Sequence, residues 1–250
     1  MSISTDFKEK IVLITGGTKG IGKGIAKSFI DSKAKVYVCA RNAPKEKIKG
    51  STFLQCNVND PDNIEDMFSE IIAEDNRIDV VINNAGGGPM VQAEKAPPKL
   101  SESIIKLNLL APLNVSQVAN RYMQESVGGN IINICSVSVL RPTPGAAAYG
   151  SAKAGLANLT QSLAIEWAPK VRVNAIVSGL IKTEQAKNYY GDEESIKRVS
   201  KTIPLERMGN PSDIGKGCLF LSSNLADYIS GAILEIHGGG EKPIYQNVIE

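Results

Sequence analysis

A tyrosine and a lysine lie one helical turn apart at Tyr149 and Lys153, within Tyr149-Gly150-Ser151-Ala152-Lys153. Side chains four residues apart on a helix share one face. Tyrosine has an unperturbed pKa of about 10, and a nearby positive charge lowers it by favouring the phenolate. Hydride transfer to a carbonyl leaves an oxyanion that needs a proton and hydrogen-bond donors. The pair therefore predicts acid–base chemistry on a carbonyl or alcohol, with Tyr149 as the proton donor.

One hydroxyl group could take part in the same chemistry. Ser136 ends an apolar, β-branched run at 130–136 and precedes Tyr149 by thirteen positions. Its hydroxyl can hold a substrate oxygen by a hydrogen bond. Taken alone, a tyrosine and a lysine at helical spacing are also typical of an amphipathic helix whose long side chains reach solvent, and that alternative stays open.

Histidine and cysteine are too few and too scattered for other common kinds of site. His237 is the only histidine, which leaves little room for a Ser-His-Asp or Cys-His arrangement or a multi-histidine metal site. The four cysteines contain no C-x-x-C pair, so we expect buried, reduced thiols. The sequence thus predicts no metal, and catalysis must use another acid or base.

A glycine-rich turn lies near the start of the chain, in Thr15-Gly16-Gly17-Thr18-Lys19-Gly20-Ile21-Gly22. It follows a predicted strand at 11–15 and opens a predicted helix at 20–31. Glycines let the backbone approach a pyrophosphate, whose charge is received by the amides and dipole of the helix start. The alternative is a purely structural turn. The residues expected to contact a dinucleotide here are Gly16, Thr18, Lys19, Gly20, Ile21 and Gly22.

The end of the second predicted strand bears on the choice between NAD and NADP. An acidic residue at this place holds the ribose 2′-hydroxyl of NAD, but the sequence reads Cys39-Ala40-Arg41-Asn42. A guanidinium can hold a 2′-phosphate through several hydrogen bonds, and Lys19 can add a second positive charge. Arg41 and Lys19 therefore favour NADP(H), with an ordinary surface arginine as the alternative.

Apolar, β-branched runs alternate along the chain with stretches of helical spacing, as in a parallel sheet covered on both faces. We predict about seven strands, at 11–15, 35–40, 52–56, 79–83, 130–136, 171–177 and 232–236. The predicted helices lie at 20–31, 61–74, 100–126, 149–168 and 211–223. The fold class is α/β, a doubly wound parallel sheet of the Rossmann type in a single domain over 1–250. The segment 181–210, of mixed polarity, is expected to be a substrate lid.

The composition and net charge limit the classes of partner that the protein is expected to bind. Of 250 residues, 42% are hydrophobic, enough for one large domain, and the net charge is only +2. So small a charge does not favour nucleic acid or anionic membranes as partners. No apolar run approaches the ~18 residues of a spanning helix, and the first residues do not form a signal peptide. The sequence therefore predicts a cytoplasmic protein that binds a small molecule.

Further motifs accompany these residues along nearly the whole chain. They are Asn83-Asn84-Ala85-Gly86, Pro204-Leu205-Glu206-Arg207, Gly231 and the closing Gly238-Gly239. With the glycine turn, Ser136 and the Y-x-x-x-K motif, they resemble the short-chain dehydrogenase/reductase family. The resemblance implies a homotetramer or homodimer, and it implies Asn108 as a fourth catalytic residue that fixes a water linking Lys153 to solvent. The further cofactor contacts that it implies are Asn57, Val58, Asn84, Ala85, Gly86, Tyr149, Lys153, Gly179, Ile181 and Thr183.

Three positions depart from the family's pattern without touching the proton-transfer residues. Asn57 stands where the family often has an aspartate near the adenine, Ser178 replaces the proline of a common Pro-Gly turn, and His237 replaces an acid. The first two are expected to alter cofactor contacts or loop rigidity, because an amide is uncharged and serine lacks the fixed dihedral of proline.

The substrate is the least determined feature. The segments 86–88, 163–168 and 188–191 also resemble the enoyl-thioester reductases of fatty-acid metabolism. The intact set of Ser136, Tyr149 and Lys153 suits interconversion of a ketone and an alcohol, so the first hypothesis is an NADPH-dependent 3-oxoacyl-thioester reductase. An enoyl-thioester reductase is the alternative, and a non-catalytic NADPH-binding regulator is a remote third. Sugars, steroids and cyclic ketones also remain open as substrates.

Overall fold

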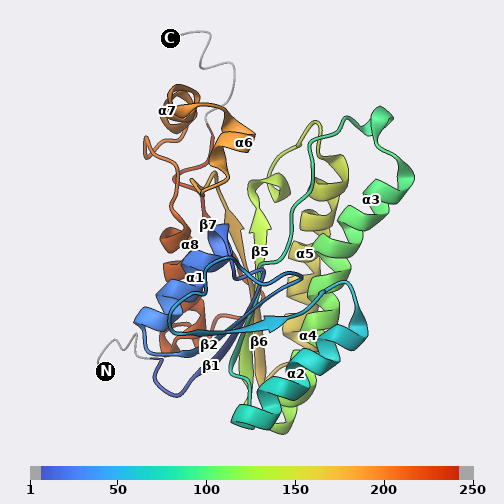
Figure 1. Ribbon diagram of the computed structural model, residues 1–250, viewed down its shortest axis with the longest axis vertical. Coiled ribbons are helices and arrows are strands. Elements are labelled where there is room, and N and C mark those ends of the chain that lie inside the picture. Colours follow the sequence, from blue (N-terminus) through green and yellow to red (C-terminus); the bar gives the residue numbers. More distant parts are fainter. Residues whose placement is uncertain (1–6, 242–250) are drawn as a thin grey trace.

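The computed structural model describes residues 7–241, and these form a seven-stranded sheet between two layers of helices (Figure 1). The strands are β1 Ile11–Thr15, β2 Lys35–Ala40, β3 Ser51–Gln55, β4 Val80–Asn83, β5 Gly129–Ser136, β6 Val171–Ser178 and β7 Ile233–Ile236. Their order is β3-β2-β1-β4-β5-β6-β7, with every neighbouring pair parallel. The predicted Rossmann-type α/β fold is confirmed.

The helices divide between the two faces of the sheet, as Figure 1 shows, with α1 and α8 on one face and α2, α4 and α5 on the other. They are α1 Gly20–Asp31, α2 Pro61–Asp75, α3 Pro98–Ile105, α4 Ala111–Glu125, α5 Ala147–Glu166, α6 Ala186–Tyr190, α7 Glu193–Lys201 and α8 Pro211–Ser222. Because crossover connections of parallel strands are right-handed, two helical layers form when the chain winds outward in both directions from β1.

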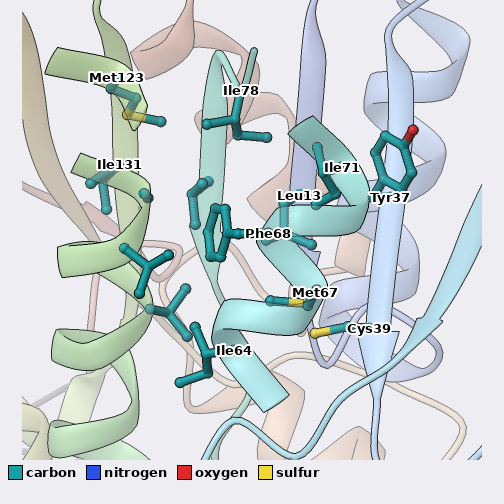
Figure 2. Packing of buried hydrophobic residues seen from close by; sticks show 14 of the residues in the cluster. Leu13, Tyr37, Cys39, Ile64, Met67, Phe68, Ile71, Ile78, Met123 and Ile131 are labelled. Carbon is teal, nitrogen blue, oxygen red and sulfur yellow. The ribbon is translucent and has the colours of Figure 1, made fainter. Parts of the chain in front are cut away.

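The core follows from the alternation of side chains along each strand. In β1, Leu13 packs beneath α2 and α4, whereas Val12 and Ile14 pack beneath α1 and α8. Figure 2 shows Phe68 of α2 at the centre of the first of these clusters. Phe68 is fully buried, and burying such a side chain contributes about 1.5–3 kcal/mol. Two such clusters hold the sheet between its helices and so fix the carboxyl ends of its strands.

The predicted helix at 100–126 is wrong in one respect, because two helices lie there. Helix α3 ends at Ile105, a π-helical turn spans Lys106–Leu110, and α4 begins at Ala111. Pro112 explains the irregularity, since it has no N–H to donate to the carbonyl of Asn108 four residues earlier. π-turns of this kind are frequent at functional sites, and this one contains Asn108.

The segment 181–210 contains two short helices that the sequence analysis did not predict, α6 and α7. A small cluster of its own, formed by Ala186, Ile196, Ile203 and Met208, holds them together. Helix α5, in contrast, begins two residues before its predicted start, so that Tyr149 and Lys153 both lie within its first two turns.

Candidate active site

A cleft of about 840 Å³ opens at the carboxyl ends of the strands, beside the switch point between β1 and β4 where doubly wound folds bind ligands. The predicted cofactor contacts that line it are Gly16, Thr18, Lys19, Gly20, Ile21, Arg41, Asn57, Val58, Asn84, Ala85, Gly86, Tyr149, Lys153 and Thr183. Gly179 and Ile181 instead line a smaller cavity of about 390 Å³, and Gly22 is buried behind the turn.

The glycine turn at one end of the cleft is held by its neighbours across the sheet. The Asn84 side-chain amide donates to the carbonyls of Thr15, at 2.9 Å, and Gly16, at 3.1 Å. The Thr15 hydroxyl oxygen accepts the backbone N–H groups of Asn84 and Ala85, each at 3.0 Å. A Cβ at Gly22 would lie 2.4 Å from the Gly16 carbonyl oxygen and 2.5 Å from Asn84 Nδ2. The turn therefore depends on glycine at this contact, and the Asn84 side chain holds the backbone of the turn in place.

The far end of the cleft, beyond the glycine turn, is basic. Lys19 and Arg41 are exposed at its edge, and the sequence analysis missed Lys23 and Lys45, which line it too. Lys45 follows Arg41 by four positions in one loop, a cluster of positive charge visible in the sequence. Glu46 lines the cleft beside Lys45 as well, so this end carries four cations and a carboxylate from the same loop.

The side chain of Asn57, one of the departures from the family's pattern, makes a hydrogen bond within its own loop. Its side-chain oxygen accepts the N–H of Asn59 at 3.3 Å, the pattern of an Asx turn. An aspartate could accept the same bond, so the change to asparagine removes a charge from the cleft wall and keeps the turn.

Tyr149 and Lys153 meet on α5, at the opposite end of the cleft from Arg41. The Lys153 ammonium lies 5.9 Å from the Tyr149 ring centroid and donates to the carbonyl of Ile134 at 2.8 Å. Lys153 is only 3% exposed, and this burial lowers its pKa. Burial raises the pKa of Tyr149, while a hydrogen bond with Ser136 works in the opposite direction. Tyr149 therefore holds its proton at neutral pH next to a hydroxyl partner.

Ser136, at the end of β5, has a second hydroxyl beside it that the sequence analysis missed. Its oxygen accepts the backbone N–H of Ser138 at 3.3 Å and lies 3.2 Å from the Ser138 hydroxyl. The Ser-x-Ser pattern after a strand is the signal that could have indicated this pair. The two hydroxyls and Tyr149 present three hydrogen-bonding oxygens in one place.

Asn108 is fully buried in the π-helical turn and holds the backbone at the wall of the cleft. Its side-chain oxygen accepts the N–H of Gly87 at 2.8 Å, and its amide donates to the carbonyls of Gly87 and Ile104, each at 2.9 Å. A Cβ at Gly86 would lie 2.7 Å from Asn108 Oδ1 and 3.3 Å from Lys153 Nζ. Both ends of the amide bind backbone, so Asn108 positions the loop after β4, and its link to a relay water stays a prediction.

Buried amides and hydroxyls fix the relative positions of the elements that carry these residues. Asn83, at the end of β4, donates to Ser116 of α4 and to Asn133 of β5, each at 2.8 Å. Asn133 in turn donates to the Thr160 hydroxyl of α5 at 2.9 Å. Buried hydrogen bonds of this kind make one arrangement of the elements preferable to others. The chain of contacts connects the loop of Asn84 to the helix of Tyr149.

The remaining departures and the cysteines have structural roles. The Ser178 hydroxyl donates to the Cys135 carbonyl at 3.0 Å, which ties the end of β6 to β5 without a proline. His237 lies 2.6 Å from Glu235 through Nε2 and Oε2, outside the large cleft. All four cysteines are buried and free, as predicted. Within residues 7–241, no group of side chains has the composition of a metal site.

Glu184 lines the cleft and was not predicted there. Its carboxylate accepts the N–H of Gly20 at 2.8 Å, at the start of α1. An anion is therefore held where the glycine turn was expected to receive a pyrophosphate. The glycine cradle, the helix start with an anion on it and the elongated cleft all fit a dinucleotide. The acid–base pair of Tyr149 and Lys153, at the end opposite Arg41, defines the class as a dinucleotide-dependent oxidoreductase.

Comparison with known proteins agrees with this class. A family model described as enoyl-(acyl carrier protein) reductase matches residues 16–241. The chain is 32% identical to the 3alpha-hydroxysteroid dehydrogenase of Mediterraneibacter gnavus and 34% identical to a 3-oxoacyl-(acyl-carrier-protein) reductase of Chlamydia muridarum. Each alignment is 246 positions long and covers 92% of this chain and 96% of the relative. The ligand-free aldohexose dehydrogenase of Thermoplasma acidophilum has a similar structure, with a TM-score of 0.89 at 31% identity, covering 94% of this chain and 95% of that one.

The chain belongs to the short-chain dehydrogenase/reductase family. It is an oxidoreductase with a nicotinamide cofactor and a small-molecule substrate, as membership of the family implies. Among residues 7–241, none of the helices is long and apolar enough to cross a membrane.

Proposed function

We propose that the protein interconverts a carbonyl and a secondary alcohol with NADP(H), using Tyr149 as acid and base. The observation that carries this proposal is the position of Tyr149 and Lys153 at one end of the cleft, with the Ser136 hydroxyl close enough to Tyr149 to lower its pKa. A merely amphipathic pair would lie on a solvent face, whereas Lys153 is buried under the cleft floor. A lysine is buried at such cost chiefly where its charge is used.

The residues around the cleft fit the cofactor in three places. The glycine turn and the first N–H groups of α1 would receive the diphosphate. Arg41 and Lys19 would hold the 2′-phosphate of NADP(H). Thr183, which lines the cleft beside Gly20, would face the nicotinamide amide. When bound, the nicotinamide donates or accepts the hydride.

The proton is handled by this chain's own residues. Tyr149, whose pKa burial raises, is protonated at neutral pH and donates its phenol proton to the oxygen that becomes an alkoxide. Ser136 donates a hydrogen bond to the same oxygen and stabilises its charge as it forms. The Lys153 ammonium then stabilises the phenolate that remains. By microscopic reversibility, the phenolate accepts the proton when the alcohol is oxidised.

For the substrate, we propose a 3-oxoacyl thioester first. The similarity to a 3-oxoacyl-(acyl-carrier-protein) reductase supports it, and the hydroxyls of Ser136 and Tyr149 suit a ketone oxygen. Reduction of an enoyl thioester is the second candidate, favoured by the description of the matching family model. The similarities to a steroid and an aldohexose dehydrogenase keep those alcohols in any screen. A non-catalytic NADPH-binding regulator would be expected to have lost the proton donor, which this chain retains.

Two further features belong to this proposal. The segment 181–210 would act as a substrate lid, because its helix α6 places Tyr189 and Tyr190 close enough to Tyr149 to raise its pKa. The family resemblance supports a homotetramer or homodimer, which light scattering of the purified protein measures directly.

The test follows the loss of reduced-nicotinamide absorbance, with NADPH and NADH each offered against a 3-oxoacyl thioester and a trans-2-enoyl thioester. Consumption of NADPH with the ketone alone is expected. Consumption with the enoyl compound alone would favour the second candidate. If neither is reduced, steroid and sugar alcohols with NADP are tested in the oxidative direction, and NADPH binding without turnover of any of these would support the regulator.

A further inference from the structure

Glu184 makes a contact that the proposed reaction does not require. Its carboxylate Oε1 accepts the backbone N–H of Gly20 at 2.8 Å, across 164 positions of sequence. Desolvation raises the pKa of Glu184, but the Gly20 bond and the charges of Lys23 and Lys19 outweigh it, so its pKa lies below the usual value. The group is therefore an anion at neutral pH, held by one N–H and near two lysines.

This anion occupies the start of α1, which is the place that the fold offers to the cofactor's diphosphate. Gly20 is the first residue of α1, and the first N–H groups of a helix have no partner within it. The N-cap residue Lys19 makes no side-chain cap here, so Glu184 provides the acceptor from elsewhere in the chain. A diphosphate needs the same N–H groups and carries charge of the same sign as the carboxylate. Both groups cannot occupy this position without repulsion.

Glu184 also belongs to the segment 181–210, so its contact connects that segment to the cofactor end of the cleft. The base of the segment is fixed by backbone bonds, from Lys182 N–H to the Gly209 carbonyl at 2.8 Å and from Gly209 N–H to the Leu180 carbonyl at 2.9 Å. Beyond this base, α6 starts two residues after Glu184 and carries Tyr189 and Tyr190, which lie close enough to Tyr149 to raise its pKa. Release of Glu184 would free the part of the segment that leads to the substrate.

We propose that Glu184 holds the segment 181–210 against the phosphate-binding end of the cleft, and that the diphosphate of the arriving cofactor displaces it. Cofactor binding then changes the position of the segment that meets the substrate. This inference rests on the proposed cofactor site. Its consequence is that the wild-type carboxylate weakens cofactor binding, because it competes for the N–H of Gly20.

Glu184→Gln tests the competition. The amide oxygen can still accept the Gly20 N–H, but the negative charge is gone, so NADPH is expected to bind several-fold to tenfold more tightly than to the wild type. Titration calorimetry measures this affinity without turnover. Adenosine 2′-monophosphate, which has no diphosphate, serves as the second ligand, and its affinity is expected to stay unchanged.

Glu194→Gln is the matched control. Glu194 lies in the same segment, carries the same charge and pairs with Arg198 on the exposed face of α7. It should leave the affinity for NADPH as in the wild type. Equal affinities for NADPH in Glu184→Gln and wild type would overturn the proposal, and so would an equal gain for NADPH and adenosine 2′-monophosphate, which would indicate a general charge effect.

Hydrogen exchange of the amides of α6 and α7 gives a second readout. Addition of NADPH to the wild type is expected to change their exchange, and Glu184→Ala, which has no acceptor for Gly20, is expected to show much of that change before cofactor is added. Identical exchange in all states would contradict displacement. A failure of the proposed function can be told apart from a failure of this inference by measurements on the wild type alone. The wild type would then bind no nicotinamide cofactor, or would bind the cofactor and turn over no carbonyl compound. If NADH binds and NADPH does not, the comparison of Glu184→Gln with wild type uses NADH and has the same two outcomes.

Discussion

Two regions meet at the cleft, and they are built differently. The glycine turn after β1 presents backbone, and buried or half-buried groups fix that backbone: Thr15 and Asn84 bond it, and Gly22 admits its close approach. The segment 181–210 presents side chains on two short helices, with Tyr189 63% exposed and ion pairs such as Lys182–Glu193 on its surface. One small apolar cluster holds it together.

This difference indicates that the first region binds the cofactor and that the second region contacts the substrate. A site made of backbone tolerates few residue types, because a single added methyl group collides with that backbone. Such a site suits a ligand that is the same in every member of a family. A site made of exposed side chains on a weakly packed segment can change residue by residue, and segments with few buried contacts open at low free-energy cost. We therefore expect changes at the first region to affect folding and cofactor, and changes at the second to affect substrate.

The largest effect is expected at the acid–base pair of α5, which belongs to neither region and serves the reaction itself. Lys153→Met removes the buried charge that stabilises the Tyr149 phenolate, so turnover should fall by about 10²-fold or more, the usual contribution of such acid–base catalysis. Steady-state kinetics measure this, with Lys27→Met, at an exposed lysine of α1, as control. Turnover of Lys153→Met within a few-fold of the control would show that the lysine is only structural.

Gly22→Ala tests the rigidity of the first region. Its Cβ would lie 2.4 Å from the Gly16 carbonyl oxygen, and overpacking of this kind costs about 1–3 kcal/mol of unfolding free energy. Urea denaturation measures the loss, and NADPH affinity should fall with it. Gly150→Ala is the control, because its nearest neighbouring atoms lie 3.8 Å away and alanine suits a helix. Equal stability of the two variants would mean that the turn relaxes easily.

Arg41→Asp tests the one part of the cofactor region that depends on exposed side chains. The change removes a hydrogen-bonding cation and adds the acid that holds a 2′-hydroxyl, so the ratio of NADPH to NADH affinity should fall by about tenfold or more, since bonds to charged groups contribute about 1.5–3 kcal/mol each. Fluorescence titration with both cofactors gives the ratio. Lys47→Asp, an exposed change in the same loop, should leave it unaltered. An unchanged ratio in Arg41→Asp would remove the basis for NADP preference.

The smallest effect on the fold is expected in the second region. Tyr189→Ser removes an exposed ring from α6, so the unfolding free energy should change by only about 0.5 kcal/mol. The KM for the carbonyl substrate should still shift several-fold, with NADPH affinity constant. A change in NADPH affinity with no change in KM would reverse the division between the two regions.

The two regions also differ in how far their structure could be predicted from the sequence. The strands, α1 and the glycine turn follow from periodicity and from glycine spacing, because local residue types determine them. The split at Lys106–Leu110 depends on the missing N–H of Pro112, a signal present in the sequence but overlooked. Helix α6 has only five residues, too few for a periodic pattern. Helix α7 does carry an amphipathic signal, with Ile196 and Val199 three positions apart in a polar sequence, which was missed. The contact of Glu184 with Gly20 joins residues 164 positions apart, and no local pattern reports such a meeting.

The most direct test of the central claim is the activity of Tyr149→Phe, measured with the accepted carbonyl substrate alongside its affinity for NADPH. The ring stays and only the hydroxyl is lost, so packing on α5 is preserved. Turnover should fall by about 10²-fold or more while NADPH binds as it does to the wild type. Turnover comparable to that of the wild type would show that another group supplies the proton, and would contradict the assignment of Tyr149 as acid and base.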